Sequence, residues 1–146
     1  MDFLEGILEE KGNVVRSVRP DVAVLEAVET MCASHVGALL VMLGAEVVGM
    51  FSERDLMKRV VLARRDPARV CVGDVMTSRV VCAEHDASPT EVMEVMTREH
   101  VRHLPVLRGR QVDGIVSMGD LVRWTMRERE HAVAQLTEYV TGKYPG

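Results

Sequence analysis

Two short phrases of the chain combine a hydroxyl and a carboxylate at the same spacing. Ser52 precedes Asp55 in GMFSERDL, and Ser117 precedes Asp120 in GIVSMGDL. In the first turn of a helix this spacing forms a capping box, in which the serine oxygen accepts a backbone N–H and the carboxylate reaches back. The same geometry suits a nucleotide, because free N–H groups favour phosphate and a carboxylate can accept both hydrogens of a ribose diol. The spacing alone leaves both interpretations open.

The two phrases belong to an internal duplication. With a constant offset of 65 residues and no gap, the segment 14–60 aligns with the segment 79–125. In this alignment 15 of 47 positions are identical, whereas ordinary residue usage gives roughly three by chance. The Ser and Asp of the two phrases are therefore equivalent positions in two copies of one unit.

Each copy predicts the same order of elements. A short strand leads into a helix, whose start in the second copy is marked by Ser88 as N-cap, Pro89 and Glu91, which closes a capping box. Two strands and a second helix follow, and the helix begins at Ser52 or Ser117. The strands are expected at 14–18, 38–42 and 46–51, and at 80–83, 104–108 and 111–116. Because a copy of roughly 55 residues buries little apolar surface alone, we expect an α+β fold of two β-α-β-β-α repeats, packed sheet to sheet with pseudo-twofold symmetry.

The duplicated unit resembles a known family. The order of elements, the paired GxxSxxD phrases, DVMT at 74–77 and HLPV at 103–106 resemble the cystathionine-β-synthase (CBS) domain in its usual tandem pair. The resemblance implies a regulatory module without catalytic activity that binds adenine nucleotides in two clefts between the repeats. Candidate ligands are AMP, ADP, ATP, NADH and S-adenosylmethionine, with no required cofactor. The expected divisions are an N-terminal helix (1–12), a first repeat (13–69), a second repeat (70–126) and a C-terminal helical extension (127–146).

The resemblance also implies roles for individual residues. Asp55 and Asp120 take the ribose hydroxyls, and Ser52 and Ser117 help to hold phosphate. Adenine lies against groups near the first strand and just before the LPV strand of the opposite repeat. For the Asp55 cleft these correspond to Thr77, Ser78, Val101 and Arg102, with His103 beside them and Met50 from the repeat of Asp55 itself. For the Asp120 cleft they correspond to Lys11, Gly12, Asn13, Val36, Gly37 and Ile115.

The two clefts are expected to differ in charge. Arg102 and His103 of the second copy stand where the first copy has Gly37 and Ala38. A guanidinium is suited to paired hydrogen bonds with phosphate. The sequence therefore predicts a stronger phosphate grip in the Asp55 cleft than in the Asp120 cleft.

The two ends lie outside the duplicated unit. Phe3, Leu4, Ile7 and Leu8 place apolar groups on one side of a short N-terminal helix. The segment 119–142 is expected to form one helix of about 23 residues, or about 35 Å, with apolar positions at Val122, Met126, Val133, Leu136 and Val140. This helix either folds back over its own domain or packs on a second copy. We favour the second alternative, a homodimer, which is common among stand-alone bacterial CBS pairs.

Composition and short motifs argue against several other classes of protein. A net charge of −4 argues against nucleic acid, and the basic run from Lys58 to Arg69 fits a solvated face. The longest apolar run, 36–43, is too short for a membrane span, and with no visible signal peptide we expect a cytoplasmic protein. The cysteines Cys32, Cys71 and Cys82 form no CxxC, and no ligand cluster completes the pair His100 and His103, so no metal is expected.

Three functional hypotheses follow. The leading one is a nucleotide-sensing module that acts through a regulated partner. The alternative is an interaction protein with the same fold and dimer, in which the SxxD phrases serve only as helix caps. An enzyme is disfavoured, because the chain contains no Walker loop and no GxGxxG.

Overall fold

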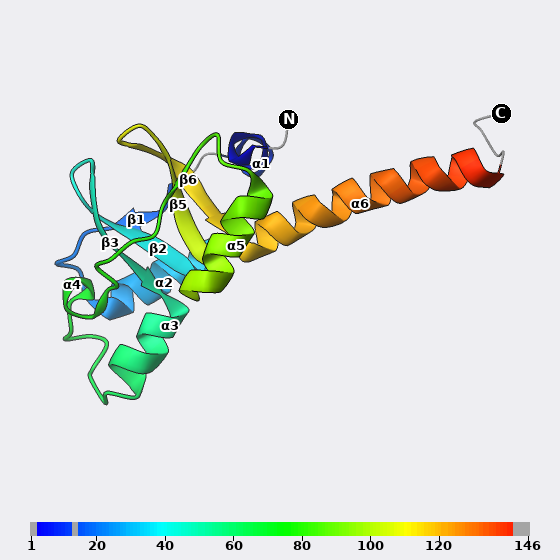
Figure 1. Cartoon of the computed structure of the whole chain (residues 1–146). Coiled ribbons are helices and arrows are strands. Elements are labelled where there is room, and N and C mark those ends of the chain that lie inside the picture. Colours follow the sequence, from blue (N-terminus) through cyan, green and yellow to red (C-terminus); the bar gives the residue numbers. More distant parts are fainter. Residues whose placement is uncertain (1–2, 13–14, 142–146) are drawn as a thin grey trace.

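Two three-stranded sheets with helices around them form the body of the molecule (Figure 1). The computed structural model describes the backbone of residues 3–12 and 15–141, and the side chains of these ranges as far as residue 130. In each sheet the first strand is parallel to the second, and the second is antiparallel to the third. The α+β class and the repeated order of elements are confirmed.

The first repeat is built from residues 17–61. Its strands are β1 (Ser17–Val18), β2 (Ala38–Leu43) and β3 (Glu46–Ser52). Its helices are α2 (Val24–Ser34), α3 (Glu53–Asp55) and the π-helix η1 (Leu56–Val61), which continues directly from α3. Only two residues of β1 pair with β2, so this strand is shorter than expected.

The second repeat has the same plan at the predicted offset. Its strands are β4 (Ala83–Glu84), β5 (His103–Arg108) and β6 (Gln111–Ser117), and its helices are α5 (Pro89–Glu99) and α6 (Met118–Thr141). The register is also repeated, because Val41 pairs with Gly49 and Val106 with Gly114. The duplication is therefore structural as well as sequential.

The helix that opens each repeat is bounded by local signals. Ser88 Oγ accepts the Glu91 N–H at 3.2 Å, and Pro89 occupies the first helical position. The predicted capping box is only half formed, because the described residues show no hydrogen bond from the Ser88 N–H to the Glu91 carboxylate. Both α2 and α5 end at a histidine in the left-handed conformation, His35 (φ 55°) and His100 (φ 57°). This position closes a helix, so His100 acts as a C-cap.

The two sheets pack face to face. One apolar cluster contains Leu40 and Met50 of the first sheet together with Val112 and Ile115 of the second. Separate cores fill the outer side of each sheet, and each buries its own first helix and second strand. The predicted sheet-to-sheet packing with pseudo-twofold symmetry is confirmed.

Two short helices are exchanged between the repeats, because each one completes the core of the repeat that it does not directly precede in sequence. The helix α4 (Val72–Val75) precedes the second repeat but lies in the first core, whereas α1 (Leu4–Lys11) precedes the first repeat but lies in the second core. The Leu4 N–H donates to the Ala87 carbonyl at 3.1 Å, as the Val72 N–H donates to the Val22 carbonyl at 2.9 Å. The sequence interpretation treated residues 1–12 as a separate N-terminal helix, and the structure packs α1 into the core of the second repeat. It is the counterpart of α4, because its apolar face completes the second core.

The long C-terminal helix was predicted correctly in extent. α6 is one helix of 24 residues, and Figure 1 shows its second half pointing away from the two sheets. It does not fold back over its own domain. Val122 and Met126 are 41% and 55% exposed, while Val133, Leu136 and Val140 lie outside the residues whose side chains are described. None of the described helices is both long and apolar enough to cross a membrane.

Candidate functional site

Both SxxD phrases form capping boxes. Asp55 Oδ2 accepts the Ser52 N–H at 3.0 Å, and the Asp55 N–H donates back to Ser52 Oγ at 3.4 Å. Asp120 Oδ2 accepts the Ser117 N–H at 2.9 Å, and the return bond measures 3.1 Å. The carboxylates are buried, at 6% and 8% exposure. Each therefore has a fixed orientation, with its Oδ1 atom not used by the box.

The glycine that opens each phrase makes room for the exchanged helix segments. A Cβ atom on Gly49 would lie 2.9 Å from the Thr77 carbonyl oxygen, and one on Gly114 would lie 3.0 Å from Leu8 Cδ2. A side chain at either position would push the segment away from the strand. The repeated Gly thus brings the segment after α4 close to Asp55, and α1 close to Asp120.

Thr77 completes the surroundings of Asp55. Its hydroxyl donates to Asp55 Oδ1 at 2.9 Å, and its backbone exchanges two hydrogen bonds of 2.9 Å with Met50. The described cation at this carboxylate is Arg59, whose Nε lies 3.8 Å from Oδ1 and whose side chain is 52% exposed. The structure thus brings together Ser52, Asp55, Met50 and Thr77, as the sequence predicted. Ser78 follows Thr77 and is exposed.

The segments before β2 and β5 lie at the junction of the repeats. The Gly37 carbonyl accepts the Glu53 N–H at 3.0 Å, and the Arg102 carbonyl accepts the Met118 N–H at 2.8 Å. Each segment is thus bonded to the second helix of its own repeat. Across the junction, Arg54 Nη1 donates to the His100 carbonyl at 3.1 Å. Val36 and Val101, which lie beside these groups, are half-buried.

His103 also lies beside residues that the sequence assigned to the Asp120 cleft. It pairs with Ser117 across β5 and β6, and a Cβ atom on Gly37 would lie 3.2 Å from its ring. Burial lowers the pKa of His103, with Lys11 and Arg102 acting in the same direction and Glu53 and Asp120 opposing it. Burial therefore favours the neutral ring in the ligand-free protein.

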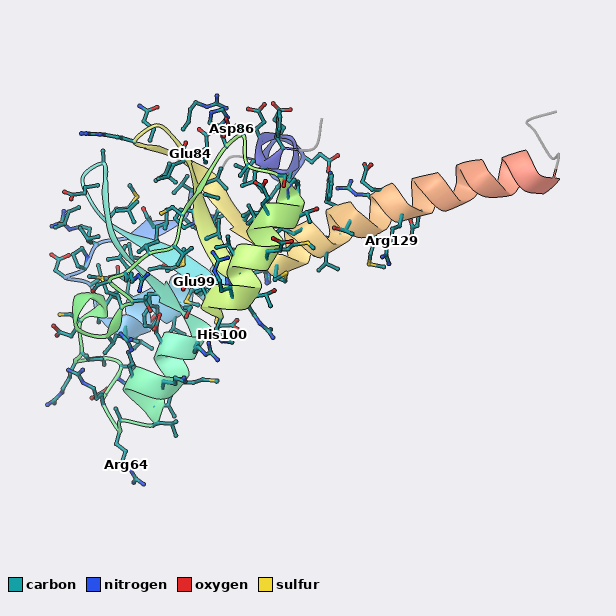
Figure 2. The ribbon with its side chains drawn as sticks, in the orientation of Figure 1. Arg64, Glu84, Asp86, Glu99, His100 and Arg129 are labelled. Carbon is teal, nitrogen blue, oxygen red and sulfur yellow. The ribbon has the colours of Figure 1, made fainter. Side chains whose placement is uncertain are left out.

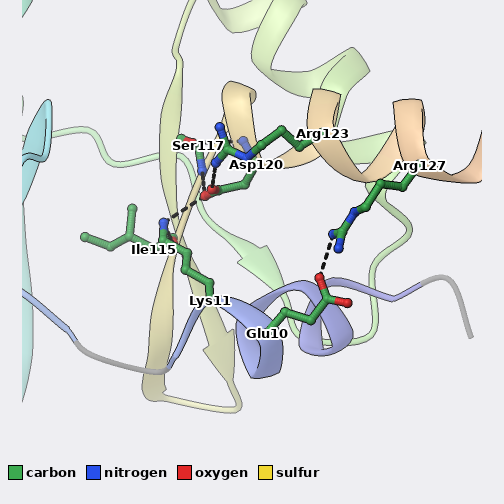
Figure 3. A network of polar contacts seen from close by, with 7 residues as sticks. All are labelled: Glu10, Lys11, Ile115, Ser117, Asp120, Arg123 and Arg127. Atoms are coloured by element: carbon green, nitrogen blue, oxygen red, sulfur yellow. Dashed lines mark hydrogen bonds and ion pairs between the residues drawn. The ribbon is translucent and has the colours of Figure 1, made fainter.

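Cations gather around Asp120 instead, as Figure 3 shows. Lys11 Nζ donates to Asp120 Oδ2 at 2.7 Å and to the Ile115 carbonyl at 2.8 Å. Arg123 Nη2 donates to Asp120 Oδ1 at 2.6 Å. Burial raises the pKa of Asp120, but the hydrogen bonds from Lys11 and Ser117 outweigh it and hold the pKa below its usual value. Lys11, Ile115, Ser117 and Asp120 therefore meet in one place.

The remaining predicted residues of this cleft are less informative. Gly12 ends α1 with a φ of 91°, and Asn13 lies outside the described residues. Arg123 was missed by the sequence interpretation. Its signal was available, because it follows Asp120 by three residues and helical side chains three apart share a face. The equivalent residue in the first repeat is Lys58.

Glu10 extends this network to the long helix. Its Oε2 accepts a hydrogen bond of 2.6 Å from Arg127 Nη2, between the end of α1 and the second turn of α6 beyond Asp120 (Figure 3). Figure 2 shows how densely side chains cover the body, and it places His100 at the C-terminal end of α5. Among the described residues, no three histidine, cysteine or acidic side chains come together as metal ligands would.

Comparison with known proteins identifies the class of this fold and site. Residues 12–62 and 72–127 each match the family model of the CBS domain. The chain belongs to the CBS domain family and carries two copies of the domain. CBS domain pairs are regulatory modules, which agrees with the class that the resemblance predicted.

Individual relatives extend this comparison. The mitochondrial CBS domain-containing protein CBSX3 of Arabidopsis thaliana is 31% identical over 129 residues, which make up 85% of this chain and 63% of that protein. The chain thus spans less than two thirds of that relative. A crystal structure of a CBS-domain containing protein from Agrobacterium tumefaciens is 36% identical with a TM-score of 0.80, over 84% of this chain and 98% of that one.

A second solved structure shares the fold and contains ligands. The CBS domain pair of protein MJ0100, in complex with 5′-methylthioadenosine and S-adenosyl-L-methionine, has a TM-score of 0.76 at 20% identity. The similarity covers 86% of this chain and 97% of that one. At this identity the comparison establishes the common fold.

Proposed function

We propose that this chain is a non-catalytic sensor module that binds adenine nucleotides or related adenosyl ligands at Asp55 and Asp120. The observation that carries the proposal is the pair of buried carboxylates, each fixed by a capping box beside an exchanged segment of the chain. A carboxylate held in this way can accept two hydroxyl hydrogens of ribose without first paying for its own ordering. The complex of MJ0100 with two adenosyl ligands supports adenosine as the shared part of the ligand.

The surrounding residues have proposed roles in this function. Ser52 and Ser117 contribute to holding phosphate, and Arg102 pairs with phosphate in the Asp55 cleft. The adenine ring packs against Met50 and Val101 at Asp55. At Asp120 it packs against Val36 and Ile115. The remaining proposed contacts are Ser78, His103, Asn13 and Gly37.

Thermal unfolding tests the proposal directly. A ligand that binds only the folded state raises the midpoint, by an amount that grows with the ratio of ligand concentration to Kd. We expect a concentration-dependent rise with at least one of AMP, ADP, ATP, NADH and S-adenosylmethionine. Inosine monophosphate serves as the control, because it keeps ribose and phosphate but changes the base. If none of the five ligands moves the midpoint, the proposal is wrong.

A second function is favoured by the completeness of the capping boxes. Both boxes are closed by the protein's own groups, so each Ser and Asp already stabilises a helix start without any ligand. In this alternative the chain is an interaction protein whose clefts bind no physiological nucleotide. The thermal experiment separates the two, since only the sensor responds to ligands.

We also propose that the module forms a homodimer. On the second helices of the repeats, Met57 and Val122 occupy equivalent positions, as do Val61 and Met126, and their exposures are 60%, 41%, 61% and 55%. Two equivalent apolar faces on one chain match two faces of a second copy related by a twofold axis, because such an interface is self-complementary. The protein regulated by the dimer is a separate partner.

A further inference from the structure

The Asp120 cleft already holds cations where a ribose would bind. In the Asp55 cleft both side-chain hydrogen bonds to the carboxylate come from neutral hydroxyls, of Thr77 to Oδ1 at 2.9 Å and of Ser52 to Oδ2 at 3.1 Å. In the Asp120 cleft, Lys11 takes Oδ2 at 2.7 Å and Arg123 takes Oδ1 at 2.6 Å. A ribose diol needs the lone pairs of the same two oxygens. It can therefore reach Asp120 only if the ammonium group of Lys11 gives way.

Once Lys11 is displaced from Asp120, its ammonium group needs a new anionic partner. The side chain of Lys11 is 39% exposed and that of Arg123 is 69% exposed, so both can turn without breaking the core. Lys11 also donates to the Ile115 carbonyl, which keeps its ammonium group beside the cleft. A phosphate group brought by the ligand can replace the carboxylate as the anion that these cations contact. Adenosine has no such group, and S-adenosylmethionine carries an additional positive charge on sulfur.

We propose that Lys11 is an internal competitor for ribose at Asp120, and that this cleft consequently selects phosphorylated adenine ligands over neutral or cationic adenosyl ligands. The Asp55 cleft has no equivalent ammonium group among the described residues, so it accepts both kinds. This inference rests on the proposed function, because it assigns ligand classes to the same two sites.

The position of Lys11 couples this exchange to the rest of the chain. Lys11 is the last residue of α1, and the preceding residue, Glu10, contacts Arg127 of α6 at 2.6 Å. When Lys11 leaves Asp120, the end of α1 is held to the second repeat by fewer contacts. Ligand binding at the Asp120 cleft should thus change the contact between α1 and the first half of α6.

Calorimetric titration with adenosine and AMP tests the inference. In a protein that carries Asp55→Asn, only the Asp120 cleft should contribute a binding signal. In this background Lys11→Met should strengthen adenosine binding about tenfold, because the competitor is gone, and weaken AMP binding, because a phosphate partner is gone. The control is Arg110→Met, which removes one positive charge from the exposed turn between β5 and β6 and should leave the preference for AMP unchanged.

The experiments distinguish a failure of this inference from a failure of the proposed function. If the starting protein binds AMP but Lys11→Met changes adenosine and AMP affinity by the same factor, or changes neither, the inference is wrong while the sensor function stands. If the unsubstituted protein binds no adenine ligand in the thermal experiment, the function itself is wrong.

A second measurement addresses the contact without any ligand. Lysines occur at positions 11, 58 and 143, so amine labelling followed by peptide mass spectrometry resolves each one. Lys11 should react more slowly than Lys58 in the unsubstituted protein, and Asp120→Asn should remove this protection. Equal labelling of Lys11 and Lys58 in the unsubstituted protein would overturn the role assigned to Lys11.

Discussion

Asp55 and Asp120 show how equivalent residues acquire different properties. Each belongs to a closed capping box, and each is buried. They differ in their partners outside the box, which are the Thr77 hydroxyl at Asp55 but the Lys11 ammonium group and the Arg123 guanidinium at Asp120. Because a neutral hydroxyl is easier to displace than a charged donor, the two carboxylates should differ in their availability to a ligand.

Substitution of the two carboxylates should therefore have unequal effects. We expect two nucleotide-binding events, of which Asp55→Ala abolishes the tighter and Asp120→Ala mainly the weaker. The affinity difference should be about tenfold to a hundredfold, the usual worth of one charge-assisted hydrogen bond. Calorimetric titration with AMP measures both events. Loss of the tight event in Asp120→Ala would contradict the assignment.

The stability of the ligand-free protein should depend on the ionisation of Asp120. Because the folded-state pKa lies below the usual value of 3.8, ionised Asp120 stabilises the fold fully above that value. The contribution is lost as the pH falls through the lower folded-state pKa. The difference in urea stability between the unsubstituted protein and Asp120→Asn should thus be largest at neutral pH and should shrink as the pH falls below 3.8. A difference that stays constant over this range would show that Lys11 and Ser117 do not stabilise the charge.

At the scale of elements, α1 behaves as part of the second repeat. Leu4, Ile7 and Leu8 are buried against Val92, Met96 and Val116 and their neighbours. Its backbone is joined to the segment before α5 through Ala87 and His85. Glu5 adds a side-chain link, since it accepts hydrogen bonds from His85 at 3.2 Å and Arg108 at 3.1 Å. We therefore propose that the second structural unit comprises α1 together with β4, α5, β5, β6 and the start of α6, and that α4 belongs to the first unit.

A core substitution in α1 tests this assignment. Leu4 is fully buried, so Leu4→Ala should lower the free energy of unfolding by about 2 to 5 kcal/mol through lost contacts and a cavity. Glu9→Ala, on the exposed side of the same helix, should change it by less than about 0.5 kcal/mol. Chemical denaturation measures both variants. If Leu4→Ala costs no more than Glu9→Ala, α1 is not part of the core.

The features predicted from sequence were those encoded over short distances. The SxxD boxes, the Ser88 cap and the strand alternation lie within a few residues, and the constant offset of 65 made the repeat visible. The pairing of α1 with the second repeat was not visible, because only a short apolar pattern marks it. The contact between Lys11 and Asp120 spans 109 positions. The family resemblance assigned Lys11 to the Asp120 cleft, but no local pattern specifies the ion pair itself, because it depends on where the folded chain places α1.

At the scale of the whole molecule, α6 is the feature that extends beyond the body (Figure 1). An exposed helix of 24 residues that carries apolar groups such as Val122 and Met126 gains stability by packing on a second helix. If the terminal helices form the dimer interface, deletion of residues 127–146 should convert dimer to monomer. The circular dichroism spectrum of the tandem core should stay largely intact.

Light scattering measures this change in assembly. A second variant, Met57→Ser with Val61→Ser in the full chain, tests the other part of the proposed interface, because it alters the exposed face of η1 but keeps the terminal helix. If the truncated chain remains dimeric while the η1 variant dissociates, the interface lies on the paired second helices of the repeats.

The exchanged helices α1 and α4 also have a consequence for the origin of the chain. Each repeat completes its core with a helix that belongs, in sequence order, to the other unit. A single ancestral unit with the same connections would have left its own helix unplaced, and it would have been completed by trading helices with a second copy. Gene fusion of such a pair yields one chain with an internal twofold seam. If the chain arose in this way, a unit of residues 69–127 made alone is expected to associate with itself.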